Sequence, residues 1–121
     1  MPNICLGWLK MWLKTNEDLD LNLKGISIVE VSGESCANCL TLMPILDKLV
    51  SNMENVKLFH IEADKDTMPL IEKFEIMAVP TILVLYNQEI KARCKGFQPE
   101  EILELWLDAK VGEIKKEYNL V

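Results

Sequence analysis

The feature that most constrains the fold is an alternation of strand and helix patterns in residues 26–61. Ile26–Val31 is rich in β-branched residues and leads to a turn at Gly33, which is typical of a buried strand. From Cys36 onward, apolar residues recur at spacings of three and four, as in a helix, and Val56–Ile61 is again a strand pattern. Two strands joined through one helix form a βαβ unit with parallel strands. The helix then begins at the carboxyl end of the first strand, where open α/β sheets usually carry their chemistry.

The second half of the chain predicts a hairpin followed by a helix. A short helix is expected first, from about Thr67 to Phe74. Thr81–Tyr86 and Ile90–Lys95 are separated by only three residues, so these strands should be antiparallel. Pro99 then opens the last helix. We therefore expect an α/β fold, with a central mixed β-sheet built from a βαβ unit followed by ββα and helices on both faces.

The N-terminal segment, residues 1–24, is expected to be a helix and a connection. Ile4–Leu13 is apolar with Trp8 and Trp12 at helical spacing, which favours a first helix packed on the sheet over one that binds a surface. The run is too short to cross a bilayer and lacks the flanks of a signal peptide, so we expect a cytoplasmic protein with no membrane contact. Asn16–Lys24 has features of both a strand and a loop and is left open.

Composition limits the number of domains and the partners. With 121 residues, half of them hydrophobic, the chain should form a single domain, 1–121, with its core at about 25–110. The net charge is -6 and charges of both signs are mixed along the chain, so nucleic acid is not expected as a partner. Four unevenly spaced cysteines do not resemble a secreted disulfide scaffold. We expect a monomer.

The motif Cys36-Ala37-Asn38-Cys39 is the main candidate for chemistry, because it lies where strand meets helix. Unpaired N–H groups at a helix start stabilise a thiolate, so Cys36 should be the nucleophile. Cys39, one turn on, would resolve the mixed disulfide formed at Cys36. The alternatives are two core cysteines or half of a metal site. Because Cys5 and Cys94 are isolated, a four-ligand site is disfavoured and no metal is expected.

A second motif is Ala78-Val79-Pro80-Thr81, in which a proline precedes a strand. It is either an ordinary loop proline or a cis proline that turns the chain sharply into the strand.

The order of these elements resembles thioredoxins, over about Gly25 to Lys110. The resemblance implies that Pro80 is cis and lies against the active-site cysteines, and that the backbone of Val79 pairs with a substrate chain by β-strand addition. It also implies that Thr81 and Gly96 belong to this substrate groove, although a turn before the last helix explains Gly96 equally well.

Two polar residues extend the resemblance into the sheet. Glu30, a charge inside an apolar strand, matches the buried aspartate of thioredoxins, which takes a proton from the resolving cysteine, here Cys39. The alternative is a glutamate on a half-exposed strand. His60, the only histidine, lies where the family usually has a lysine near that acid. It could exchange a proton with Glu30 or be only a satisfied polar neighbour.

This chain differs from thioredoxins at the cysteines. Thioredoxins have Trp-Cys-Gly-Pro-Cys, whereas Ser35 to Cys39 read Ser-Cys-Ala-Asn-Cys and lack both the tryptophan and the proline. We therefore expect a less reducing couple. The leading hypothesis is a thiol-disulfide oxidoreductase that acts on protein disulfide substrates, uses a separate thioredoxin-reductase-type electron donor and needs no cofactor. The alternatives are a redox-silent binding module and a carrier of a metal cluster between two subunits.

Overall fold

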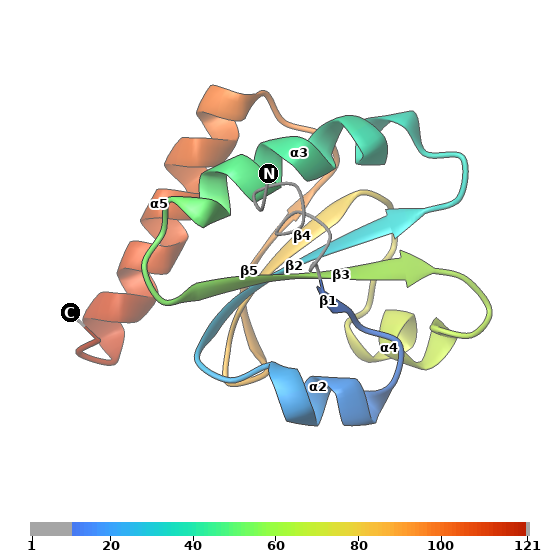
Figure 1. The fold of residues 1–121 in the computed structure, drawn as a ribbon, viewed down its shortest axis with the longest axis horizontal. Helices are drawn as coiled ribbons and strands as arrows, with labels where there is room; N and C mark the ends of the chain where they lie inside the picture. The colour runs from blue at the N-terminus through green and yellow to red at the C-terminus, as the bar shows by residue number, and fades with distance from the viewer. Residues whose placement is uncertain (1–10, 121) are drawn as a thin grey trace, which may run out of the picture.

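A five-stranded mixed sheet lies at the centre of the molecule (Figure 1), in a computed structural model that describes residues 11–120. The strands are β1 (Met11–Trp12), β2 (Ile26–Gly33), β3 (Val56–Ala63), β4 (Thr81–Tyr86) and β5 (Glu89–Lys95), in the spatial order β1-β3-β2-β4-β5. β3 pairs in parallel with β1 and β2, and β4 pairs antiparallel with β2 and β5. The predicted βαβ unit followed by a hairpin is confirmed.

Helices cover both faces of this sheet (Figure 1). They are α2 (Asn16–Asn22), α3 (Ala37–Ser51), α4 (Met68–Lys73) and α5 (Glu100–Glu117). α3 and α5 pack on one face, and α2 and α4 pack on the other. Because successive strand residues point to opposite faces, Ile28 joins the core under α3 and α5, whereas Val29 joins the core above α2 and α4.

The core extends beyond residues 25–110. Leu13, Leu19 and Leu23 are almost completely buried in the layer of α2 and α4. At the other end of the chain, Val111 and Ile114 of α5 are buried against the sheet. Both terminal parts of the described chain therefore contribute to the packing.

The expected N-terminal helix is wrong for Met11–Trp12, which form β1 beside Phe59 and His60 of β3. The N–H of Leu13 continues this pairing by donating to the carbonyl of His60 at 2.8 Å. The physical reason is that the free edge of β3 offers unpaired backbone groups, and a strand satisfies them whereas a helix does not. The remainder of the predicted helix, including Trp8, lies outside the described residues.

Asn16–Asn22, in the segment whose pattern has features of both a strand and a loop, forms helix α2. The first turn of this helix explains why it forms. Thr15 is the N-cap: its hydroxyl accepts from the N–H of Asp18, whose carboxylate in turn accepts from the N–H of Thr15. Leu19 and Leu23, four residues apart, are buried, while Leu21 is 67% exposed. The alternation of leucines is therefore a helix pattern with one exposed member.

Strand register places one row of side chains across the whole sheet. Trp12 pairs with His60, His60 with Glu30, Glu30 with Ile82, and Ile82 with Cys94. Ile82 packs in the core under α3 and α5, so the row faces these two helices. Glu30 and His60 thus lie on the same face of the sheet as the helix that follows the Cys-x-x-Cys motif.

Candidate functional site

The two cysteines of the motif lie at the start of α3, directly after β2 and a two-residue connection. Cys36 and Cys39 form a disulfide with a Cα–Cα distance of 5.3 Å. Cys36 is the N-cap of α3, and its Sγ accepts from the N–H of Cys39 at 3.2 Å. Cys36 is partly exposed, whereas Cys39 is only 2% exposed. The helix start therefore directs a backbone donor at the more accessible sulfur, which is the arrangement that stabilises a thiolate there.

The loop between α4 and β4 lies against the connection that leads to the cysteines. The peptide bond between Val79 and Pro80 is cis, Pro80 is buried and Val79 is half-buried. A side chain at Gly33 would place its Cβ 2.9 Å from Cγ2 of Val79. Gly33 is therefore needed for close approach, because any larger residue would push the Val79 loop away from the end of β2.

Two further contacts hold this loop. The hydroxyl of Thr81 donates to the carbonyl of Ala78 at 2.6 Å. The N–H of Gly96 donates to the carbonyl of Pro80 at 2.7 Å, and Gly96 has a φ of 85°, which favours glycine. Thr81 and Gly96 thus support the loop that carries Val79 and Pro80, and the turn at Gly96 also leads toward α5.

Glu30 lies in a completely buried polar cluster between the sheet and α3. Its Oε1 is 2.9 Å from Nδ1 of His60, and its Oε2 accepts a hydrogen bond from the hydroxyl of Ser32. Glu30 and His60 are both 0% exposed. The alternative of a half-exposed glutamate is therefore excluded, and the carboxyl group has one partner for each oxygen.

The surroundings of His60 indicate which ring nitrogen carries the proton. Its Nε2 is buried without a hydrogen-bond partner among the described residues, and the ring of Trp12 lies 5.2 Å away, centroid to centroid. An unpartnered buried N–H is costly, so we assign the proton to Nδ1, where Glu30 accepts it. In this arrangement His60 and Ser32 are both donors to Glu30, one to each carboxyl oxygen.

Sequence reasoning missed Ser32 and the close approach of Gly33 to Val79. Ser32 is two residues after Glu30, and the two-residue period of a strand puts both on one face. That spacing in the sequence is enough to predict that Ser32 lies near Glu30. The contact of Gly33 joins segments 46 residues apart, and no local pattern could have named its partner.

The remaining cysteines do not extend the site. Cys94 is a free thiol on β5, and burial raises its pKa, so it behaves as a weakly ionised core residue. Cys5 lies outside the described residues. Within residues 11–120, no group of three or more His, Cys, Asp or Glu side chains could hold a metal ion.

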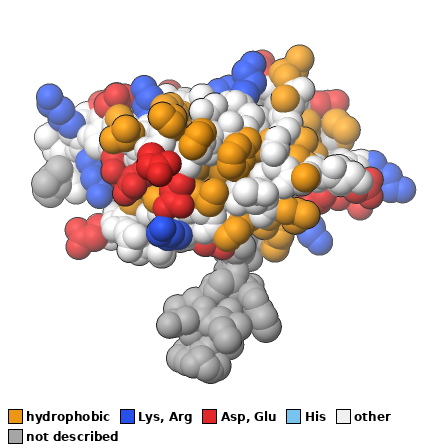
Figure 2. Space-filling view, turned by 90° about the horizontal axis from the view of Figure 1, so that it is seen from above, with side chains coloured by type: hydrophobic (Ala, Val, Ile, Leu, Met, Phe, Trp, Pro, Cys, Tyr) orange, Lys and Arg blue, Asp and Glu red, His pale blue; other side chains and the backbone are white. Residues whose placement is uncertain are grey.

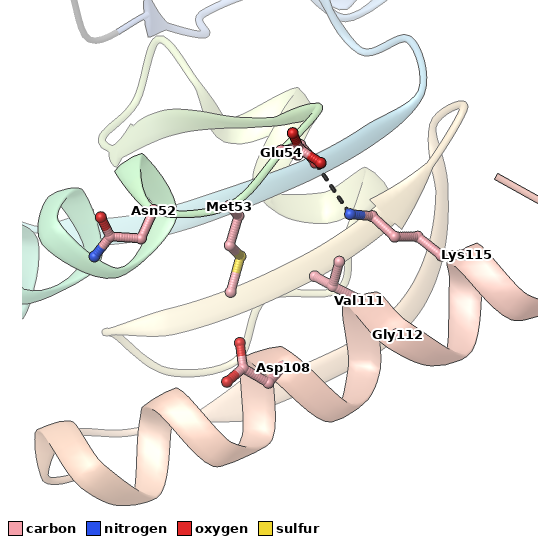
Figure 3. Close-up of a pocket in the computed structure, with 7 residues that line it drawn as sticks. All are labelled: Asn52, Met53, Glu54, Asp108, Val111, Gly112 and Lys115. Carbon is pink, nitrogen blue, oxygen red and sulfur yellow. Dashed lines mark hydrogen bonds between the residues drawn. The ribbon is translucent and has the colours of Figure 1, made fainter. Parts of the chain in front are cut away.

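The outer surface of α3 and α5 is partly apolar, and a pocket lies away from the cysteines. The face of α3 and α5 presents scattered apolar side chains interrupted by acidic groups (Figure 2), and Leu40, next to Cys39, is 73% exposed. A pocket of about 330 Å³ lies between the end of α3 and α5. Figure 3 shows Met53, Asp108 and Lys115 around this pocket. Nζ of Lys115 donates a hydrogen bond to the backbone carbonyl of Glu54. Because the cysteines are at the other end of α3, this pocket is not part of their site.

No helix in residues 11–120 is long and apolar enough to cross a membrane.

Comparison with known proteins identifies the family. A family model described as Thioredoxin matches residues 11–109. The chain is 31% identical over 96 residues to a thioredoxin of Staphylococcus haemolyticus, covering 78% of this chain and 91% of that protein. It is 31% identical over 91 residues to a thioredoxin of Staphylococcus saprophyticus, covering 74% and 86%. Among solved structures, a mutant thioredoxin from Halobacterium salinarum has the same fold, with a TM-score of 0.73 at 17% identity over 84% of this chain and 90% of that chain. The chain therefore belongs to the thioredoxin family.

Proposed function

We propose that the chain transfers two electrons to disulfides of protein substrates, with Cys36 as the attacking thiolate and Cys39 as the resolving thiol. Family membership and the Cys-x-x-Cys pair make the chain a protein-disulfide oxidoreductase, and the residue roles are our assignment. The observation that carries this assignment is the asymmetry of the pair. Cys36 is partly exposed at the helix start, whereas Cys39 is buried behind it.

In the first step, the Cys36 thiolate attacks a substrate disulfide. A bond forms between Cys36 Sγ and one substrate sulfur, and the other substrate sulfur leaves as a thiolate. The N–H of Cys39, which lies 3.2 Å from Cys36 Sγ in the oxidised protein, supports this role because it can stabilise negative charge on that sulfur.

In the second step, Cys39 gives its proton to the Glu30 carboxylate and attacks Cys36 Sγ. The Cys36–Cys39 disulfide forms and the second substrate sulfur leaves, so the substrate has gained two electrons. Burial of Glu30 under α3, with His60 and Ser32 as donors to its two oxygens, supports its role as the proton acceptor.

The substrate chain is held by Val79, Pro80, Thr81 and Gly96. The contact of Val79 with Gly33 supports this, because it brings the loop against the connection that leads to Cys36. Val79 is half-buried, and pairing through its backbone would accept many substrate sequences.

Family membership implies protein disulfide substrates and a reductase that returns electrons to the dithiol. We add to the proposal that this donor is a separate thioredoxin-reductase-type enzyme. We also propose that the chain acts as a monomeric single domain in the cytoplasm. No bound cofactor is needed, because the electrons are carried by the two sulfurs.

The experiment that tests the function is the equilibrium reduction potential, measured by alkylating free thiols across a glutathione and dithiothreitol series and weighing the products. We expect one reversible two-thiol transition, at a potential above the value of about -270 mV typical of thioredoxin. Insulin reduction should be abolished in Cys36→Ser, and Cys39→Ser should accumulate a mixed disulfide. Absence of a reversible transition would contradict the proposal.

The role of Glu30 is tested separately with Glu30→Gln, which keeps the shape of the side chain but cannot accept a proton. The mixed disulfide should persist longer in this variant than in the parent protein, measured by quenching single turnovers with acid. An unchanged lifetime would remove Glu30 from the mechanism.

A further inference from the structure

The loop between α4 and β4 is anchored by a cation from a distant strand. Nη1 of Arg93, on β5, donates to the carbonyl of Glu75 at 3.1 Å. Glu75 directly follows Phe74, the C-cap of α4, and has a φ of 53°, so the chain reverses direction there before it reaches Val79 and Pro80. The guanidinium is therefore bound at the first bend of the segment to which we assign the substrate groove.

The position of Arg93 explains how it reaches this bend. Arg93 pairs with Leu83 of β4, and Leu83 belongs to the core cluster that includes Phe74. Side chains of paired residues point to the same face, so Arg93 lies on the α4 side of the sheet, beside the end of that helix. No carboxylate within residues 11–120 forms an ion pair with it. Its charge is thus free to strengthen the bond to the Glu75 carbonyl.

The middle of the loop has little else to hold it. Met77 is 83% exposed and Ala78 is also exposed. Just beyond the bend, the N–H of Ile76 donates to the carbonyl of Ile71 at 2.9 Å, and the Ile76 side chain packs against the core on the α4 side of the sheet. Closer to β4, the contacts are those of Thr81 with Ala78, Gly96 with Pro80, and Val79 with Gly33. The last three contacts fix the end of the loop next to β4. At the end next to α4, Ile76 is bonded to its own helix, and Arg93 adds a hydrogen bond that links the bend to strand β5.

We propose that Arg93 is a positioning residue for substrate binding: by holding the Glu75 carbonyl, it sets where the backbone of Val79 lies relative to Cys36. It does not touch the reacting sulfurs. This inference rests on the proposed function, because it assumes that Val79 binds the substrate chain. Arg93 should therefore affect only the reduction of substrates that bind in the groove. Small disulfides that react directly at Cys36 should be reduced equally well without Arg93.

The test compares a protein disulfide with a small one in Arg93→Met, which keeps an unbranched apolar side chain in place of the arginine stem and removes the donor. With insulin as substrate and dithiothreitol as electron donor, KM should rise about fivefold and kcat should stay nearly constant, as expected for losing one charge-assisted hydrogen bond at a half-exposed position. The rate with bis(2-hydroxyethyl) disulfide should not change. In Arg93→Lys, KM for insulin should return close to the parent value, because the lysine ammonium can donate to the same carbonyl.

Two further measurements separate the possible outcomes. Lys57→Met makes the same charge change at an exposed position on β3 and should leave KM for insulin unchanged. Amide hydrogen exchange over residues 74–79 should be faster in Arg93→Met than in the parent protein. The inference is overturned if KM for insulin is unchanged, if both disulfides slow equally, or if exchange in the loop is unchanged. A parent protein that reduces neither disulfide would instead overturn the proposed function, and the exchange experiment would still decide whether Arg93 holds the loop.

Discussion

The buried carboxyl of Glu30 depends on its neighbours, since it is surrounded by the sheet and α3. His60 donates to one oxygen and Ser32 to the other, and Glu30 and His60 have no exposed surface. A charge removed from water is tolerated when its partners remain, and removing one partner leaves an uncompensated buried charge. The pair is therefore expected to affect stability as a unit.

This predicts a non-additive double-mutant cycle. His60→Leu should lower the free energy of unfolding of the oxidised protein by about 3 kcal/mol, measured by urea denaturation. The double variant Glu30→Leu/His60→Leu should be less destabilised than His60→Leu alone. His60→Asn, whose amide can stand in for the Nδ1 donor, is the matched control and should retain most of the stability. If the effect of the double variant equals the sum of the separate effects of His60→Leu and Glu30→Leu, the pair is not coupled.

At Gly33, the absence of a side chain matters for function. Gly33→Ala would bring a Cβ to 2.9 Å from Cγ2 of Val79, and a β-branched side chain cannot move away without shifting its backbone. We expect slower insulin reduction with little change for a small disulfide. Gly112→Ala is the matched control, because nothing lies within 4 Å of a Cβ there. Equal turnover in both variants would contradict this role for the contact.

At the scale of elements, α2 is a short helix held by its first turn. The N–H of Lys14, above all, and the N–H and hydroxyl of Thr15 lower the pKa of Asp18 below its usual 3.8. A carboxyl group whose pKa is lowered on folding stabilises the protein above its unfolded pKa. That contribution is lost as the pH falls through the lower pKa of the folded state.

Asp18→Asn should therefore lower the melting temperature at pH 7. The difference from the parent protein should shrink as the pH falls below the usual pKa of 3.8 and disappear below the lower pKa of the folded state. Thr15→Ala also removes part of the cap and should cost about 1 kcal/mol. Since a hydroxyl does not titrate, its effect should persist in acid. A melting difference for Asp18→Asn that is independent of pH would exclude the charged cap as the cause.

At the scale of the whole molecule, both ends of the described chain complete the core. Leu13, Leu19 and Leu23 fill the layer on one face, and Val111 and Ile114 fill the layer on the other. Each fully buried side chain contributes about 2 kcal/mol, so their joint loss is comparable to the whole stability of a domain of this size.

A fragment of residues 25–110 should thus fail to unfold cooperatively, as followed by circular dichroism in urea. A fragment of residues 11–120, which keeps the described side chains of both core layers, should retain a single sharp transition. A cooperative transition in the shorter fragment with an unchanged midpoint would show that these five side chains are dispensable.

The sequence was enough to predict the elements with strong local patterns. Ile26–Val31, the helix after Cys36 and the hairpin at Thr81–Lys95 were assigned correctly, because β-branched runs, helical spacing and short turns are visible within a few residues. The position of the Cys-x-x-Cys pair at a helix start follows from the same patterns, and so does the placement of Glu30 and His60 on neighbouring strands.

Local pattern failed where distant partners decide the conformation. Met11–Trp12 form a strand because the edge of β3 is available, although the spacing of Trp12 from Trp8 in the sequence favours a helix. The bond of Ser32 to Glu30, the contact of Gly33 with Val79 and the reach of Arg93 to Glu75 exist only after the strands have aligned. Local steric and hydrophobic preferences act within a few residues and can be read along the chain. The burial of a charge and the anchoring of a loop depend on which segments the folded core brings together.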